Sequence, residues 1–112
     1  MKRFEIWLAA LPFIDNSRVT HGIRPVVIMS NDKANAYSPV VTVIPLTSKT
    51  KKPLPTHVVL ESPGLRCTSR ALCENVLALD KTRLIKPLGC VYDSYERQSL
   101  LDALCIQLGL AA

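Results

Sequence analysis

Arginine and hydroxyl side chains stand at the ends of two successive apolar runs. Arg24 begins the run at 25–29, and Thr47 and Ser48 end the next run, at 40–46. A guanidinium fork donates parallel hydrogen bonds to phosphate oxygens, and a hydroxyl adds one more directed bond. Side chains of these types can bind a phosphodiester without a metal ion. The candidate chemistry is therefore the cleavage or binding of a nucleic acid.

RNA suits this set of residues because it carries its own nucleophile, the 2′-hydroxyl next to the scissile phosphate. An enzyme then needs to hold the nucleotide in line, move protons and stabilise the charge of the phosphorane. The signatures of other catalytic classes are absent: the glycine-rich phosphate loop, H-E-x-x-H, G-x-S-x-G and a carboxylate cluster for Mg²⁺. We therefore expect neither a metal ion nor a cofactor.

Two polar loops, at 15–22 and 48–55, flank this pair, and their segments 15–21 and 48–52 are expected to read the RNA bases. His21 is a candidate proton carrier, because the reference pKa of histidine, about 6.5, suits acid or base work. A solvated loop histidine is the alternative. The other candidate RNA-binding residues from these loops and their borders are Phe13, Ser17, Arg18, Thr20, Ser48, Lys49 and Lys51.

Each candidate also has an ordinary structural interpretation. Arg24 could form an ion pair with Glu74 or Glu5 at a strand edge, and Thr47 could bond a turn backbone. The lysines of the second loop could simply be solvated. The sequence leaves these alternatives open.

Composition predicts one domain, residues 1–112, with a net charge of +5 and a pI of about 9.2. A basic excess favours an anionic partner such as nucleic acid. No apolar run approaches the roughly 20 residues that cross a bilayer, so we expect a cytoplasmic protein without a membrane contact. The four cysteines lack zinc spacing and are expected to be small, buried free thiols in a reducing compartment.

The elements that must position these residues are mostly strands. Period-two and β-branched patterns predict strands at 3–11, 25–29, 40–44 and 57–60, and a last long strand at 71–79. One helical turn is expected around residues 33–35, and Pro45 is expected to mark an edge or a bulge.

A helix at the C-terminus is expected to begin at an Asp93 cap, with Glu96 three residues later, and to stop at Gly109. Its apolar face is predicted to hold Leu101, Leu104, Cys105 and Leu108. The sum is a mainly β (α+β) fold, an SH3-like, partly open antiparallel barrel with a C-terminal helix.

Ordered motifs over nearly the whole chain resemble the MazF/PemK-like toxin ribonucleases. Residues 3–7, RFEIW, are similar to the opening strand R-G-D/E-I-W/Y, and residues 22–31, GIRPVVIMSN, to G-x-R-P-V-V-I-V-S-N. Residues 45–48, PLTS, match the end of the third strand of that family. Residues 54–58 resemble L-P-T-H-V, and residues 74–81 correspond to E-Q-I-R-T-I-D-K.

This resemblance implies the barrel of the CcdB, PemK and MazF type and a catalytic pair of Arg24 and Thr47. It implies a metal-independent, sequence-specific cut in single-stranded RNA such as mRNA, which leaves a 2′,3′-cyclic phosphate and a 5′-hydroxyl. It also implies a homodimer and a small MazE-like antitoxin with an acidic tail, with DNA contacted only through the antitoxin complex. Asn75 stands where the family has a base-reading glutamine.

Departures from the family pattern concern proton transfer and base recognition. Val19 replaces a loop glutamate argued to move protons, Leu77 replaces an arginine, and Phe4 replaces a glycine. The identity of the general base is therefore open. Two alternatives on the same fold are a CcdB-like toxin that binds gyrase and a relic that binds RNA without cutting it; the terminus LGLAA lacks the Trp-Gly-Ile-like end that the gyrase binder needs.

Overall fold

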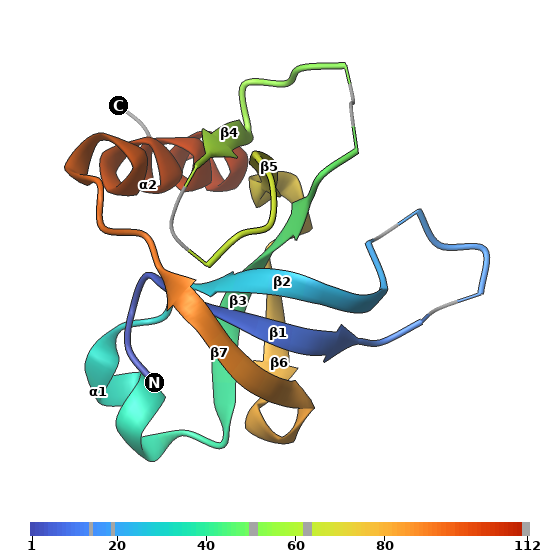
Figure 1. The fold of residues 1–112 in the computed structure, drawn as a ribbon, viewed down its shortest axis with the longest axis vertical. Helices are drawn as coiled ribbons and strands as arrows, with labels where there is room; N and C mark the ends of the chain where they lie inside the picture. The colour runs from blue at the N-terminus through green and yellow to red at the C-terminus, as the bar shows by residue number, and fades with distance from the viewer. Residues whose placement is uncertain (14, 19, 50–51, 62–63, 111–112) are drawn as a thin grey trace.

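An antiparallel sheet of seven strands forms most of the computed structural model (Figure 1), which describes residues 1–13, 15–18, 20–49, 52–61 and 64–110. The strands run in the order β4-β5-β3-β2-β1-β7, and β6 pairs with β3. The predicted mainly β class, an open antiparallel sheet with a C-terminal helix, is confirmed. In chain order, the elements are β1 (Glu5–Leu11), β2 (Gly22–Ile28), α1 (Asp32–Tyr37), β3 (Val40–Thr47), β4 (His57–Leu60), β5 (Ser69–Leu72), η1 (Cys73–Asn75), β6 (Leu77–Asp80), η2 (Lys81–Arg83), β7 (Leu84–Cys90) and α2 (Ser94–Leu108).

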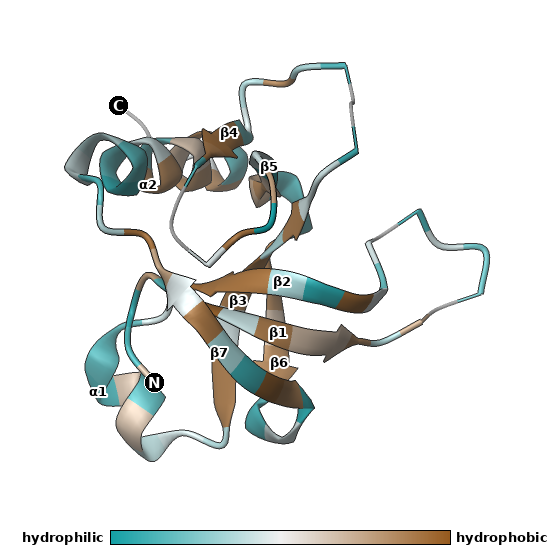
Figure 2. Ribbon diagram, in the orientation of Figure 1, coloured by the Kyte–Doolittle hydropathy of each residue, from teal (hydrophilic) through white to brown (hydrophobic). Residues whose placement is uncertain are grey.

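Alternating side chains on β2 and β3 build two separate cores, one on each face of the sheet. Val27 and Leu46 belong to the core that α2 covers with Leu100, whereas Val26 and Val43 belong to the other. Figure 2 shows the hydrophobic residues concentrated in the strands and the long loops largely hydrophilic. Burial of both faces holds the two central strands rigidly, so residues at their ends have fixed positions.

β3 changes partners along its length. Residues 40–43 pair with β6, whereas residues 46–47 pair with β5. Pro45, which has no N–H to donate, lies between these two ladders and pairs with Val26 of β2 on the other side. The expected edge or bulge at Pro45 is thus a gap between two ladders, and the strand continues to Thr47.

The single long strand predicted at 71–79 is wrong. β5 ends at Leu72, the short helix η1 follows, and β6 begins at Leu77. The N–H of Val76 donates to the carbonyl of Cys73, which turns the chain away from the ladder. β7, the true last strand, was not predicted because Lys86, Pro87 and Gly89 interrupt its apolar pattern; as an edge strand it tolerates a proline.

Helix α2 has the predicted ends. The Asp93 carboxylate accepts the N–H of Glu96 at 2.9 Å, and Gly109 closes the helix at φ 69°. The predicted apolar face is partly wrong, because Leu100 and Ala103 form its buried centre and Leu108 is 57% exposed.

The helical turn expected near residues 33–35 is α1, capped by Asn31. The four cysteines are free thiols, but the expected burial is correct for Cys73 alone, because Cys67 is exposed and the other two are partly exposed. No helix in the described part of the chain is long and apolar enough to span a membrane.

Candidate functional site

Arg24 and Thr47 occupy neighbouring positions on β2 and β3. The β2–β3 ladder ends at the pair of Val26 and Pro45, and the same register continued outward sets Arg24 opposite Thr47; both residues line the same two hollows. Arg24 is half-buried and Thr47 is 5% exposed. Side chains directly opposite each other on one face lie within reach of a shared ligand. The structure therefore brings the two residues of the predicted pair together.

The guanidinium of Arg24 is held from one side. Its Nε donates to the carbonyl oxygen of His21 at 2.9 Å, and its terminal nitrogens bond no described residue. The ion pairs considered as alternatives do not form in the described structure. The carboxylate of Glu74 binds His57 and Thr56, and that of Glu5 accepts the indole N–H of Trp7 at 2.9 Å.

The hydroxyl of Thr47 retains a free donor function. Its Oγ1 accepts the backbone N–H of Lys49 at 3.2 Å, which is the turn contact foreseen as an alternative. A hydroxyl that accepts one bond still has its own proton to donate. The turn contact consequently orients this side chain without using its donor.

Three hollows meet at Thr47, and Arg24 lines two of them. A cleft of about 680 Å³ is lined by Arg24, Thr47 and Ser48 together with Arg66 and Lys86. A second hollow of about 220 Å³ lies toward the β1–β2 loop, and a third, of about 230 Å³, toward β5. The second is lined by Ser17, Arg18, Thr20, His21, Arg24, Thr47 and Lys49, and the third by Thr47, Ser48, Lys49, Val59, Thr68, Ser69 and Arg70.

The charge in these hollows has one sign. Among the described residues, arginines and lysines line all three hollows and no aspartate or glutamate lines any of them. Hollows lined by like charges focus the field and concentrate counter-ions of the opposite sign. The site is built to attract a polyanion.

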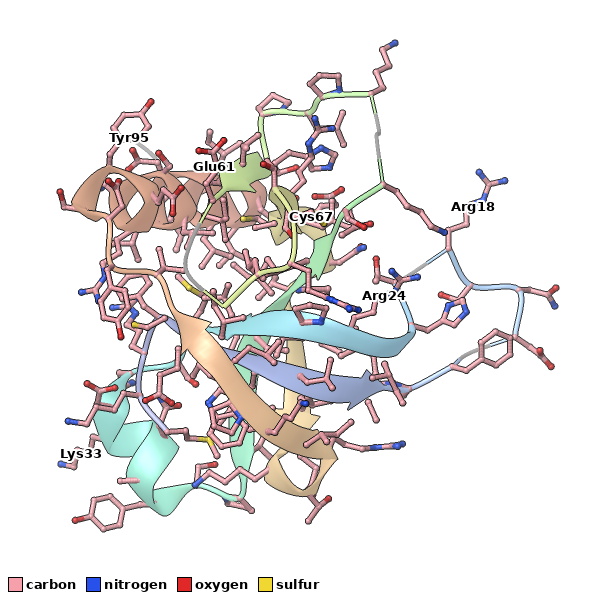
Figure 3. All side chains as sticks on the ribbon, viewed as in Figure 1. Arg18, Arg24, Lys33, Glu61, Cys67 and Tyr95 are labelled. Atoms are coloured by element: carbon pink, nitrogen blue, oxygen red, sulfur yellow. The ribbon has the colours of Figure 1, made fainter. Side chains whose placement is uncertain are left out.

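Side-chain contacts fasten the β1–β2 loop at the site. The ring of His21 meets that of Phe13 edge-on at 4.8 Å between centroids, and Asn75 Nδ2 donates to Thr20 Oγ1 at 2.9 Å. Phe13 remains 64% exposed. Figure 3 shows Arg24 near the start of β2 and Arg18 farther out, on the β1–β2 loop. Of the predicted residues, Lys51 lies outside the described part of the chain.

A second polar group, His57 with Glu74, lies outside the three hollows. His57 Nε2 and Glu74 Oε2 are 2.7 Å apart, and the histidine side chain is 5% exposed. Burial alone would raise the pKa of Glu74, but the hydrogen bonds from His57 and Thr56 and the backbone outweigh it, so this pKa lies below its usual value. We interpret the pair as a structural tie between β4 and η1.

Two cationic residues of the cleft, Arg66 and Lys86, were missed. Both are exposed, and within the described structure neither side chain forms a hydrogen bond or an ion pair. Without β7 in the expected fold, nothing placed Lys86 beside Leu8 of β1, its partner in the ladder. The charge of Arg66, next to a glycine turn, was the only available signal. No three His, Cys, Asp or Glu side chains gather as a metal-binding group among the described residues.

Comparison with known proteins gives consistent matches over almost the whole chain. The family model described as PemK-like, MazF-like toxin of type II toxin-antitoxin system matches residues 2–108. Endoribonuclease MazF of Staphylococcus saprophyticus is 38% identical over 98% of this chain and 92% of its own length.

Solved structures share the fold. A mycobacterial endoribonuclease in complex with its cognate antitoxin superposes with a TM-score of 0.81 at 25% identity, over 100% of this chain and 98% of that one. MazF from Deinococcus radiodurans superposes with a TM-score of 0.79 at 22% identity, over 96% and 94%. The family match spans both strands that carry Arg24 and Thr47, and the chain belongs to the PemK-like, MazF-like toxin family of type II toxin-antitoxin systems.

Proposed function

We propose that this toxin is a metal-independent, sequence-specific endoribonuclease that cuts single-stranded RNA such as mRNA. The observation that carries the proposal is the juxtaposition of Arg24 and Thr47 on β2 and β3, at the meeting point of hollows without acidic residues among those described. The name of the staphylococcal relative, Endoribonuclease MazF, supports the same reaction class.

The proposed reaction is an intramolecular transesterification. The 2′-hydroxyl gives up its proton to a base, its oxygen attacks phosphorus, the bond to the 5′-oxygen breaks and the 5′-oxygen takes up a proton. The products are a 2′,3′-cyclic phosphate and a 5′-hydroxyl. The terminal nitrogens of Arg24 donate to the phosphorane oxygens and to the leaving 5′-oxygen, while Thr47 Oγ1 donates to a non-bridging oxygen. The contact between Arg24 Nε and the His21 carbonyl, 2.9 Å long, holds the guanidinium ready before RNA arrives.

His21 is the proposed proton carrier, in place of the loop glutamate that this chain lacks. It lines the second hollow together with Arg24 and Thr47. The pH profile of cleavage by His21→Ala tests this role, because the variant should lose a pH-dependent step that the wild-type enzyme shows. An unchanged rate between about pH 5 and pH 8 would remove His21 from the mechanism, since a histidine titrates in that range.

The flanking loops are proposed to bind the RNA on either side of the cut. Arg18, Lys49 and Lys51 would contact phosphates, and Phe13 would stack on a base. Hydroxyl or amide contacts are assigned to Ser17, Thr20, Ser48 and Asn75.

The proposed protein partners are a second copy of this chain and an antitoxin whose acidic tail occupies the cationic hollows. Neighbouring structures solved with antitoxins, from Mycobacterial species and Deinococcus radiodurans, support the second partner. An acidic flexible segment would compete with RNA for the same charges. DNA would be contacted through the antitoxin complex alone.

The decisive experiment is cleavage of a long RNA in the presence of EDTA, comparing Thr47→Val with Thr47→Ser and Arg24→Lys. Valine keeps the shape of threonine but removes the donor, so its rate should fall about 10²–10³-fold, whereas serine should restore most of it. Lysine keeps the charge but loses the planar fork and should also be slow. The 5′ ends of the fragments should accept phosphate from polynucleotide kinase without prior phosphatase treatment.

Two outcomes would overturn the proposal. One is the absence of discrete fragments from wild-type protein in EDTA. The other is a Thr47→Val enzyme as fast as wild type. A substrate with a single 2′-deoxynucleotide at the mapped cut is the matched control for the nucleophile, and it should remain intact.

A further inference from the structure

The larger cleft continues beyond the proposed catalytic pair. Its lining holds more cationic side chains than are needed to bind one scissile phosphate. Three cationic side chains line it, those of Arg24, Arg66 and Lys86, and no described acidic residue does. Its volume of about 680 Å³ lies in the range of small-molecule pockets. An occupant must therefore combine negative charge with a body large enough to fill the space.

The floor of the cleft is one row of residues across four strands. Lys86 of β7 pairs with Leu8 of β1, and Leu8 pairs with Pro25 of β2. The β2–β3 register, extended by one residue from Val26 and Pro45, adds Leu46 to the row. All four residues line the cleft. The row is apolar from Leu46 to Leu8 and ends in an ammonium group.

The wall opposite this row is a loop fixed at two points. At Gly64, with φ +97°, a Cβ would lie 2.1 Å from the carbonyl oxygen of Leu88, so the loop rests directly on the backbone of β7. At the other end, Ser69 Oγ donates to the carbonyl of Cys67 at 3.2 Å. Arg66 lies between these points and lines the cleft without a partner among the described residues.

The proposed catalytic pair lies at the boundary between the cleft and the second hollow. Side chains alternate between the two faces of the sheet along each strand. Pro25 and Leu46 fall on the face of the core that α2 covers, whereas Arg24 and Thr47 fall on the other face. Arg24 and Thr47 nevertheless line both the cleft and the second hollow. An RNA strand whose scissile phosphate lies on this pair can therefore reach one hollow on each side of the cut.

We propose that the cleft is a subsite for the nucleotide on one side of the cut, with its base on the apolar row and its outer phosphates on Arg66 and Lys86. The inference rests on the proposed function and deepens it. A nucleobase matches the floor because stacking on apolar side chains excludes water from its faces. Two unpaired cations match successive phosphates, and the absence of described carboxylates removes any competing partner for them.

The test is binding without cleavage. The probe is a fluorescein-labelled single-stranded 12-nucleotide RNA of random sequence with 2′-O-methyl groups throughout, which removes the nucleophile. Its affinity is measured by anisotropy against salt for wild type, the double variant Arg66→Gln/Lys86→Gln and the matched control Lys33→Gln/Arg83→Gln. The control removes the same charge from exposed positions outside all three hollows.

For the cleft variant, the plot of log K against log[salt] should become less steep by about 1.4, which is about 0.7 for each lost phosphate contact. The slope of the control should change clearly less. An abasic probe of the same length should bind wild type more weakly than the base-containing probe. Equal slopes for the two double variants, or equal binding of the abasic probe, would overturn the subsite.

This test separates the two proposals. If wild type fails to cut RNA in EDTA but the cleft variant still loses its salt slope, the ribonuclease proposal fails and the subsite stands. If wild type cuts RNA while both double variants bind alike, the subsite fails and the ribonuclease proposal stands. Thermal melting of each variant checks that the fold is intact, which is expected because all four residues are exposed.

Discussion

Two hollows in the surface of the protein differ in the sign of their charge. The cleft at the ends of β2 and β3 is lined by three cationic side chains, whereas the groove between β4 and α2 is lined by Glu96 and Asp102. The groove holds about 370 Å³ and contains no lysine or arginine among its described residues. In Figure 3, Arg18 and Arg24 lie on the right of the view and Tyr95, on α2, lies on the left.

The difference teaches that the net charge of +5 is a poor guide to where an anion binds. A concave surface is likewise not enough to locate an anion-binding site, since both regions are concave. The cleft differs because strand ends supply the cations and no described carboxylate neutralises them. A polyanion should therefore bind the cleft and avoid the groove.

The largest expected effect compares Arg24→Ala with Asp102→Ala. Removal of the guanidinium should slow RNA cleavage about 10²–10³-fold, because one preorganised donor to the phosphorane is lost. Asp102 is exposed and lines the groove, so its variant should cut at the wild-type rate. Single-turnover cleavage of one RNA measures both. Comparable losses in the two variants would end the distinction between the regions.

Gly64→Ala should weaken RNA binding about tenfold, because a Cβ at this position collides with the carbonyl of Leu88 and displaces the wall of the cleft. Gly109→Ala is the matched control. It has a similar positive φ, +69°, but no atom within 4 Å of the new Cβ. Both variants should melt at lower temperature, yet only the first should lose affinity for the 2′-O-methyl probe. Unchanged affinity in Gly64→Ala would show that the wall is not needed.

Thiol labelling should distinguish Cys67 from Cys73. Cys67 is exposed at the cleft, whereas burial and then the neighbouring Glu74 carboxylate raise the pKa of the Cys73 thiol to about 12. Iodoacetamide at neutral pH should alkylate Cys67 and spare Cys73. The 2′-O-methyl probe should slow the reaction at Cys67 several-fold, as measured by mass spectrometry. A Cys67 rate that is independent of the probe would place the RNA elsewhere.

The smallest effect concerns acid stability and Glu74→Gln. The folded pKa of Glu74 is below its unfolded value, so its carboxylate stabilises the fold above that unfolded value, near 4.5, and this stabilisation disappears as pH falls through the folded pKa. Wild type should melt a few degrees above the variant at neutral pH, and the gap should close in acid. The salt slope of RNA binding should not change. A gap that persists at low pH would contradict the assignment of the shift to Glu74.

The strands that carry Arg24 and Thr47 could be predicted because their β-branched runs and flanking loops are local signals. The helix caps at Asp93 and Gly109 were equally local. The cleft wall was not predictable in this way. It depends on the contact of Gly64 with Leu88 and on β7, an edge strand whose proline and glycine hide its period.

Long-range side-chain contacts were also beyond a reading of the sequence. Asn75 and Thr20 are 55 residues apart, and only the fold shows that they bond. Phe4 is a further example: its φ of 72° explains why the family pattern has glycine there, since other residues adopt this conformation at a cost.

The pairing of β1 with β7 has a consequence for the synthesis and folding of the toxin. Leu8 of β1 lines the cleft together with Lys86 and Leu88 of β7, which come much later in the sequence. A nascent polypeptide that has not yet released its final strand lacks one side of the cleft, because such distant pairing waits for the whole chain. Under the proposed function, an unfinished copy of this chain is therefore unable to bind RNA in the complete cleft until β7 has been added.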